Sequence, residues 1–350
     1  MAELPALPAP ASILIINVSR IGDTLLVTPA VRALARAWPQ ARISFLGHPK
    51  RAEILENLPF VAEVDTITKQ RALWLGRLPG RRWDLALVYG FDRPLAEYAL
   101  RVARRVVAFR QGDAALDARL FRCVQPPSFQ SMHSALMPLL LTRALGIADA
   151  GGWLSYAVSV REQAWAKQTL AQALPHGAAP LIGLQVASFP TKAYRDWPLE
   201  HFAALCERIL GRWADAHFLI FGGALERDRT QALAGRFPGH ATLYAGRLSL
   251  RQSAALMNAV DLYIGVDTGP THIMGALRRP MIALYHCYSP SRLLAPLEHP
   301  CCYVVDHPRA AQGCNPETPM AEITVETVWA RVVEALEAHN AIAAATPVTP

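Results

Sequence analysis

Residues 12–38 read SILIINVSRIGDTLLVTPAVRALARAW and divide into an apolar part and an amphipathic part. The first part, Ser12–Val18, is mostly apolar and rich in β-branched residues, which predicts a strand buried on both faces. From about Thr24 to Trp38 the apolar residues recur at helical spacing, which predicts a helix with one buried face. A buried strand followed directly by a helix is the first unit of a parallel α/β sheet.

The same alternation continues along the chain. The first half has three more predicted strands, at Arg42–Leu46, Asp84–Tyr89 and Arg105–Phe109. In the second half the predicted strands are Leu181–Val186, Ala216–Phe221, Thr242–Tyr244, Asp261–Val266 and Met281–Tyr285, separated by helical stretches near 198–211, 225–236, 249–259 and 270–278. The fold class is therefore α/β, and an all-helical or all-β protein is excluded.

Two series of this kind indicate two domains, which agrees with a length of 350 residues at about 150 residues per domain. The segment 174–180, LPHGAAP, contains two prolines and a glycine, which interrupt a helix. We expect an N-terminal Rossmann-like domain over residues 1–174 and a C-terminal one over residues 175–350. The latter should end in an amphipathic helix beyond Ile323.

The composition is that of a globular chain. It is 52% hydrophobic and 18% charged, and no apolar run reaches the roughly 18 residues that span a bilayer. Residues 1–11 contain three prolines and no basic region, which predicts a flexible leader rather than a signal peptide and hence a cytoplasmic location. Six cysteines are too few for a disulfide scaffold, so reduced thiols are expected.

The positive charge is confined to the first half of the chain. Residues 1–165 hold 20 basic and 13 acidic side chains, whereas residues 166–350 hold 15 of each. This asymmetry favours an anionic partner of the first half, such as a phosphorylated glycolipid or a membrane surface; the alternative is a solvated arginine-rich surface. Nucleic acid is not expected, because no nucleic-acid-binding motif is present. If this charge serves an anionic partner, arginines from residues 77–82 and 101–110 should line or rim the N-terminal side of the ligand-binding cleft.

The turn Ser19–Thr24 joins the first strand to the first helix and carries Asp23. Open α/β sheets bind ligands at the carboxyl ends of their strands, so Asp23 is a candidate functional residue. The alternative is that Asp23 only caps the helix. The turn matches neither GxGxxG nor GxxxxGK[ST], so neither a dinucleotide site nor a P-loop is favoured.

Three strand-end loops of the second half carry groups suited to a nucleotide diphosphate. One follows the strand that ends near Val186, another begins at Phe221, and a third follows the strand that ends at Val266. Their candidate residues are Ser188, Lys192 and Arg195 in the first loop, Glu226 in the second, and Asp267, Thr268, Gly269 and His272 in the third. A helix that begins near Pro270 would offer backbone N–H groups to phosphate. The alternatives are solvated loop charges, an N-cap aspartate and a buried structural histidine.

Four cysteines lie near the C-terminal end of the chain, at Cys287, Cys301, Cys302 and Cys314. Four thiols can bind zinc or iron, but the usual CxxC pairs are absent, and adjacent cysteines chelate one tetrahedral ion poorly. We therefore expect no metal and no cofactor.

Four segments together carry a family resemblance. They are residues 13–46 (ILIINVSRIGDTLLVTPAVRALARAWPQARISFL), 190–205 (PTKAYRDWPLEHFAAL), 221–228 (FGGALERD) and 261–285 (DLYIGVDTGPTHIMGALRRPMIALY). In order and spacing they resemble glycosyltransferase family 9, the ADP-heptose heptosyltransferases of lipopolysaccharide assembly. The resemblance implies a glycosyltransferase-B fold, with two Rossmann-like domains facing across a cleft, and metal-independent transfer with inversion at the anomeric carbon.

The resemblance also implies roles for individual residues. Asp23 matches the general base, and Arg195 matches a cation that binds the donor diphosphate, with arginine where lysine is commoner. Glu226 resembles the residue that holds the ribose. The expected activity is transfer of heptose from ADP-heptose to a hydroxyl of the lipopolysaccharide core or a related anionic acceptor, at the inner face of the cytoplasmic membrane. The alternatives are transfer to a protein hydroxyl, use of another nucleotide-sugar, and a sugar-nucleotide-binding module without catalysis.

Overall fold

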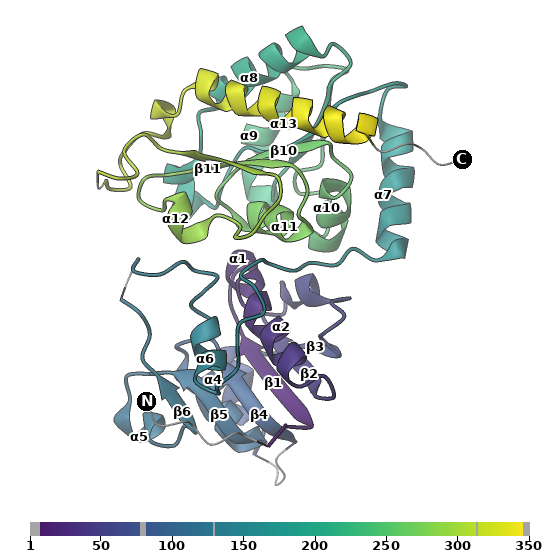
Figure 1. Ribbon diagram of the computed structural model, residues 1–350. Coiled ribbons are helices and arrows are strands. Elements are labelled where there is room, and N and C mark those ends of the chain that lie inside the picture. The colour runs from purple at the N-terminus through teal and green to yellow at the C-terminus, as the bar shows by residue number, and fades with distance from the viewer. Residues whose placement is uncertain (1–7, 78–81, 129, 313, 346–350) are drawn as a thin grey trace. The chain divides into compact units, whose positions relative to one another are not determined.

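The computed structural model describes residues 8–77, 82–128, 130–312 and 314–345. It divides into two compact units, Met1–Ala157 and Val158–Pro350, and each is a parallel sheet flanked by helices (Figure 1). The α/β class expected from the sequence is confirmed. Residues 1–7 of the expected leader lie outside the described residues.

Six parallel strands form the sheet of the first unit within its described residues, in the order β3-β2-β1-β4-β5-β6. Their bounds are β1 Ser12–Asn17, β2 Arg42–Gly47, β3 Glu63–Thr66, β4 Trp83–Val88, β5 Ala103–Phe109 and β6 Arg122–Val124. The strand order reverses between β1 and β4, and ligands of open α/β sheets bind at such a point. The short strands β3 and β6 were not predicted, because each is a three- or four-residue strand without a fully buried residue.

The helices of the first unit are short. They are α1 Ile21–Leu25, α2 Thr28–Ala37, α3 Lys69–Trp74, α4 Arg93–Val102, α5 Ala114–Asp117 and α6 Leu139–Arg143, with a 3-10 turn η1 at Ala52–Leu55. The helix predicted from about Thr24 to Trp38 is confirmed as α2, but it begins four residues later, at Thr28, because α1 is a separate helix. Pro29 lies in the first turn of α2 and has no N–H to continue a helix from α1.

The second unit repeats the architecture, with the strand order β12-β11-β10-β7-β8-β9 among its described residues. The bounds are β7 Leu181–Gln185, β8 His217–Phe221, β9 Ala241–Leu243, β10 Leu262–Val266, β11 Met281–Tyr285 and β12 Cys302–Asp306. Every residue of β7, β8, β10 and β11 is buried, as expected for central parallel strands. The order reverses between β7 and β10, so the loops after these two strands lie at the switch point.

The second unit's helices are α7 Val160–Ala173, α8 Leu199–Arg212, α9 Arg227–Ala234, α10 Leu250–Met257, α11 Gly269–Leu277, α12 Ser291–Leu294 and α13 Val325–Ala345. Its 3-10 turns are η2 Pro190–Arg195, η3 Ala224–Glu226 and η4 Met320–Glu322. The expected C-terminal helix is α13, which packs against α8 (Figure 1). Its residues Val328, Val332 and Leu336 are buried in the core of this unit.

The structure divides the chain after Ala157, earlier than the boundary expected at residues 174 and 175. Helix α7 lies between the two positions and packs against α10. Two Arg251–Glu162 contacts of 2.7 Å join these helices. Helix α7 therefore belongs to the second unit, although the strongest helix-breaking signal in the sequence lies after it.

No helix in the described part of the chain is long and apolar enough to cross a membrane.

Candidate active site

Asp23 lies in the first turn of α1, at the carboxyl end of β1. Its Oδ2 accepts a hydrogen bond of 3.1 Å from Ser19 Oγ, and its backbone carbonyl accepts one of 3.0 Å from Asn17 Nδ2. The helix begins after Arg20, so Asp23 is not its N-cap, and the capping alternative is wrong. The carboxylate is exposed and held at the switch point of the first sheet.

A cavity of about 410 Å³ lies beside Asp23 and is lined by residues of the first unit alone. The loop after β4 supplies Tyr89 and Phe91, and the end of β5 supplies Phe109. Tyr89 is 7% exposed, and its hydroxyl has no hydrogen-bond partner among the described residues. Sequence reasoning missed these residues as site residues, although the position of Tyr89 at the end of a predicted strand was a usable signal.

Among the described residues of the first unit, no arginine lines this cavity. Arg101 lies in the last turn of α4 and donates to the backbone carbonyls of Ala72 in α3 and of Leu75 directly after it. Arg104 in the first half of β5 lies 3.8 Å from Asp84. These positions are at the amino ends of β4 and β5, whereas Asp23 lies at the carboxyl edge. Arg110 does follow the carboxyl end of β5, where it lies 3.8 Å from Asp117. Residues 78–81 of the expected segment lie outside the described residues.

Arg195 is the centre of the polar contacts in the second unit. Its Nη1 lies 2.6 Å from Asp267 Oδ2, and its Nη2 donates to Ser289 Oγ at 3.1 Å. Its Nε donates to the Tyr194 hydroxyl at 3.2 Å. The guanidinium therefore joins the loops after β7, β10 and β11, and only 19% of the side chain is exposed. The alternative of a solvated loop charge is wrong for Arg195.

Tyr194 and Ser289 were missed by sequence reasoning. Burial acts to raise the pKa of Tyr194, but hydrogen bonds with Ser289 and Arg195 outweigh it, so this pKa lies below its ordinary value. Lys192 Nζ lies 5.7 Å from the centre of the Tyr194 ring and forms no ion pair among the described residues. Lys192 therefore presents a positive charge beside Arg195 that no carboxylate balances.

Ser188 and Asp196 hold the loop after β7 in shape. The Ser188 N and Oγ atoms lie 2.7 and 2.6 Å from Asp196 Oδ1, and the same Oγ lies 2.8 Å from the Lys192 carbonyl. Burial raises the pKa of Asp196. The Ser188 hydroxyl is thus already engaged within the loop, and its contact with a substrate stays a prediction.

Helix α11 begins directly after β10, and its N-terminus lies at the switch point of the second sheet. Thr268 is the N-cap residue, yet its hydroxyl makes no capping bond and is buried without a hydrogen-bond partner among the described residues. Asp267 is 2% exposed and lies 3.5 Å from His272 Nε2. Gly269 is the first helical residue, where backbone N–H groups have no acceptor within the helix. Asp267 is therefore an ion-pair partner rather than the cap, and the helix start presents unused donors.

Glu226 ends η3 and accepts a hydrogen bond of 2.5 Å from the Gly223 backbone N–H. Burial raises the pKa of Glu226, and the negative charge of Asp196 acts in the same direction. Arg229 on α9 donates to the Val186 carbonyl at 3.1 Å and so ties the helix after β8 to the loop after β7. The expected hydrogen bond from Glu226 to a ribose stays a prediction.

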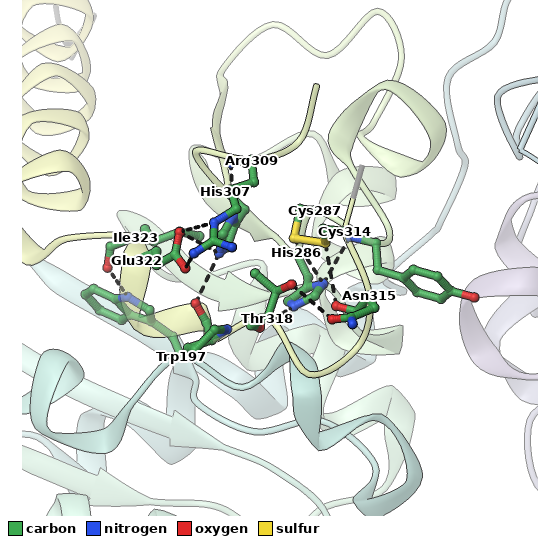
Figure 2. A network of polar contacts seen from close by, with 12 residues as sticks. Trp197, His286, Cys287, His307, Arg309, Cys314, Asn315, Thr318, Glu322 and Ile323 are labelled. Atoms are coloured by element: carbon green, nitrogen blue, oxygen red, sulfur yellow. Dashed lines mark hydrogen bonds and ion pairs between the residues drawn. A yellow bond between two sulfur atoms is a disulfide. The ribbon is translucent and has the colours of Figure 1, made fainter. Parts of the chain in front are cut away.

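Cys287 and Cys314 form a disulfide, which differs from the expectation of reduced thiols (Figure 2). They meet because Cys287 follows β11 and Cys314 lies in the segment that follows β12, at the same edge of the sheet. Cys301 and Cys302 lie at the opposite end of β12, so the four cysteines do not form one cluster. Next to the disulfide, His286 Nε2 contacts the Thr318 carbonyl at 2.8 Å, and His307 Nε2 contacts the Pro319 carbonyl at 3.1 Å.

The two Rossmann-like sheets, each with polar residues where its strand order reverses, form a glycosyltransferase-B fold. In agreement, the structure of Escherichia coli ADP-heptose lipopolysaccharide heptosyltransferase II matches with a TM-score of 0.77 at 20% identity, covering 94% of this chain and 99% of that one. The structure of E. coli heptosyltransferase WaaC with ADP-2-deoxy-2-fluoro heptose matches with a TM-score of 0.67 at 19% identity, covering 92% and 99%.

Sequence comparisons establish the family. The family model of glycosyltransferase family 9 (heptosyltransferase) matches residues 107–319. The lipopolysaccharide heptosyltransferase 1 of Pseudomonas aeruginosa is 30% identical over 292 residues, which is 78% of each chain. The chain belongs to glycosyltransferase family 9, the heptosyltransferase family, and is a glycosyltransferase. The recognition made from the four sequence segments is confirmed.

Proposed function

We propose that this enzyme transfers heptose from ADP-heptose to a hydroxyl of the lipopolysaccharide core, with inversion at the anomeric carbon. The observation that carries the proposal is that each sheet presents a complementary site at its switch point. The first presents the exposed carboxylate of Asp23 beside a cavity, and the second presents Lys192, Arg195 and the start of α11. Two of the relatives named above are heptosyltransferases of lipopolysaccharide, which supports ADP-heptose as the donor and the lipopolysaccharide core as the acceptor.

In the proposed reaction Asp23 acts as general base. The acceptor hydroxyl oxygen forms a bond to the anomeric carbon, the bond from that carbon to the diphosphate oxygen breaks, and the hydroxyl proton passes to the Asp23 carboxylate. A hydroxyl is a poor nucleophile until its proton is removed, which is the step that a positioned carboxylate accelerates. Inversion follows because attack and departure occur on opposite faces of the carbon.

The second unit binds the donor in this proposal. The leaving ADP gains negative charge as the sugar departs, and cations and backbone N–H groups that already point at it stabilise that charge. Lys192 supplies an unbalanced positive charge, the α11 start supplies N–H groups with Thr268, Gly269 and His272 around them, and Arg195 fixes Asp267 in place. Glu226 accepts hydrogen bonds from the ribose hydroxyls.

The acceptor is proposed to be an anionic glycolipid bound on the side of the first unit, so the enzyme works at the inner face of the cytoplasmic membrane. The excess of basic residues in the first half of the chain supports attraction to an anionic surface.

The test is transfer from ADP-heptose to lipopolysaccharide core acceptors, measured as ADP release and as mass of the product. The variant Asp23→Asn should lower turnover by about 10²–10⁴-fold, because it removes the base and keeps the shape. ADP affinity, measured by calorimetric titration, should not change.

The matched control is Asp65→Asn, an exposed aspartate at the edge strand β3 of the same sheet. Turnover by Asp23→Asn equal to wild type would remove Asp23 from the mechanism. Transfer to a protein acceptor alone would replace the proposed activity by a protein heptosyltransferase. ADP binding without any turnover would replace it by a sugar-nucleotide-binding module.

A further inference from the structure

The cavity beside Asp23 has a charge pattern of its own. The charged side chains that line it are Asp23 and Asp92, and none of the described lining residues is Lys, Arg or His. Lys69 Nζ lies 2.5 Å from Asp92 and balances that carboxylate. Arg51 is not a lining residue, but it donates a hydrogen bond of 3.1 Å to the carbonyl of the lining residue Ser19. A ligand in the cavity therefore meets one unbalanced negative charge and no positive one.

The cavity also has an aromatic wall. Phe91 and Phe109 stack with their ring centres 5.8 Å apart, and both line the cavity. Phe109 is fully buried, whereas Phe91 is 54% exposed, which is unusual for a large apolar side chain. An exposed aromatic ring supported by a buried one offers a flat apolar surface to a ligand.

The third feature is the Tyr89 hydroxyl. A buried hydroxyl without a partner costs about 1–3 kcal/mol, so such groups are retained where a ligand or water completes them. Tyr89 lines the cavity and is 7% exposed, and its hydroxyl is unpaired among the described residues. Its phenol stays neutral, because burial raises its pKa far above the ordinary value. It is thus a neutral hydrogen-bond donor and acceptor close to the aromatic rings of Phe91 and Phe109 in the cavity lining.

We propose that this cavity binds the ring of an uncharged pyranose, with Phe91 against its apolar C–H face and the Tyr89 hydroxyl bonded to one of its hydroxyls. The volume of about 410 Å³ suits a small molecule. The inference rests on the proposed function, since this pyranose is the unit of the acceptor that carries the attacking hydroxyl. The reacting sugar of the acceptor is thus neutral, and the anionic groups of the glycolipid bind outside the cavity.

The experiment compares pairs of methyl pyranosides that differ only at the end of the ring substituent, CH2OH in one and carboxylate in the other. Binding to the whole protein is followed by saturation-transfer NMR without any donor. The neutral member of the best-bound pair should bind at least about tenfold more tightly, because the carboxylate faces Asp23 without a cation. Tighter binding of the acid would overturn the proposal.

Two variants locate the sugar. Phe91→Ala and Tyr89→Phe should each weaken neutral pyranoside binding by about 5- to 20-fold. The matched controls lie in the same unit but outside the cavity: Trp74→Ala replaces another exposed aromatic residue, and Tyr98→Phe makes the same change at a tyrosine that is also 7% exposed. Wild-type affinity in Phe91→Ala and Tyr89→Phe would overturn the proposal.

Two further readouts separate this inference from its premises. Removal of an unpaired buried hydroxyl should leave the Tm of Tyr89→Phe equal to or above that of wild type, so weaker binding by this variant is not a folding defect. The assay needs no turnover, so neutral pyranoside binding in a protein without transferase activity would refute the proposed function alone. Transferase activity with preferred binding of the acidic sugar would refute this inference alone.

Discussion

Arg195 shows that a residue proposed from a motif to bind the donor has a structural role in the fold as well. Its Nε, Nη1 and Nη2 all contact protein atoms, on Tyr194, Asp267 and Ser289. Its positive charge is balanced by Asp267, whereas that of Lys192 is not. The sequence alone predicted two cations in one loop. Only the geometry shows that Arg195 is paired with a carboxylate whereas Lys192 forms no such pair among the described residues.

From this difference we expect Arg195→Ala to weaken ADP binding by about 10- to 100-fold, because it removes a donor and also frees Asp267 and Ser289 to move. Arg195→Lys should recover only part of this affinity, since lysine cannot span the three loops as a planar fork does. Calorimetric titration with ADP measures both variants. Arg236→Ala is the control, because Arg236 lies in the same unit in an exposed pair with Glu200. Unchanged affinity in Arg195→Ala would place the nucleotide elsewhere.

At the scale of elements, α7 shows how a helix is assigned to a unit by its partner. Glu162 caps the start of α7 through Ser159 and pairs with Arg251 of α10. Burial acts to raise the pKa of Glu162, but the hydrogen bonds from Arg251 and Ser159 outweigh it and lower this pKa from 4.5 to about 2. The pair therefore stabilises the fold above about pH 4.5, and this contribution is lost as pH falls toward 2.

We expect Glu162→Gln to lower the free energy of unfolding by about 1–3 kcal/mol at neutral pH, less than for a fully buried pair because Glu162 is 21% exposed. The difference in the free energy of unfolding between this variant and wild type should shrink as pH falls below 4.5, because the stabilisation by ionised Glu162 in the wild type then decreases. Denaturant unfolding measures both effects. Glu326→Gln, in an exposed pair with Arg208, should change stability by less than about 0.5 kcal/mol. Equal losses of stability in Glu162→Gln and Glu326→Gln would contradict the stabilising role of the Glu162–Arg251 pair.

The elements that sequence analysis missed share a physical reason. Central strands such as β7 and β10 were predicted because they are mostly apolar, and every residue in these two strands is buried. The edge strands β3 and β12 were missed, because an edge strand is covered on fewer sides and keeps polar residues, such as Glu63 and Asp65 in β3. Pairing with a neighbouring strand, which no local pattern encodes, makes these segments strands.

For the whole molecule, the fold and family were predictable, but the environment of the site was not. Four segments spread over the chain identified the family, and strand-end positions predicted Asp23, Arg195 and Asp267 as site residues. The wall of the cavity could not be predicted in the same way, because Phe109 ends β5 whereas Tyr89 follows β4. Their proximity follows from strand order, which brings β1, β4 and β5 together and which short-range patterns do not specify.

The charge of the whole chain gives the last prediction. The first half carries the excess of arginines, yet none of the described residues lining the Asp23 cavity is basic. Attraction to an anionic surface and binding of the reacting sugar should therefore respond differently to salt. Co-sedimentation with anionic vesicles should weaken steeply above about 0.1 M salt, where the Debye length is about 10 Å, because exposed charges are then screened.

Over the same salt series, the KM for a short neutral acceptor should change by less than about twofold, since contacts with Phe91 and Tyr89 involve no cation. Neutral vesicles serve as the control for the surface, and ADP affinity serves as the control for the second unit. Salt-insensitive partitioning onto anionic vesicles would leave the arginines as an ordinary solvated surface. If the KM instead rises over the same salt range in which the protein dissociates from anionic vesicles, positive charges bind the acceptor at the site of transfer, which would contradict the proposed neutral sugar site.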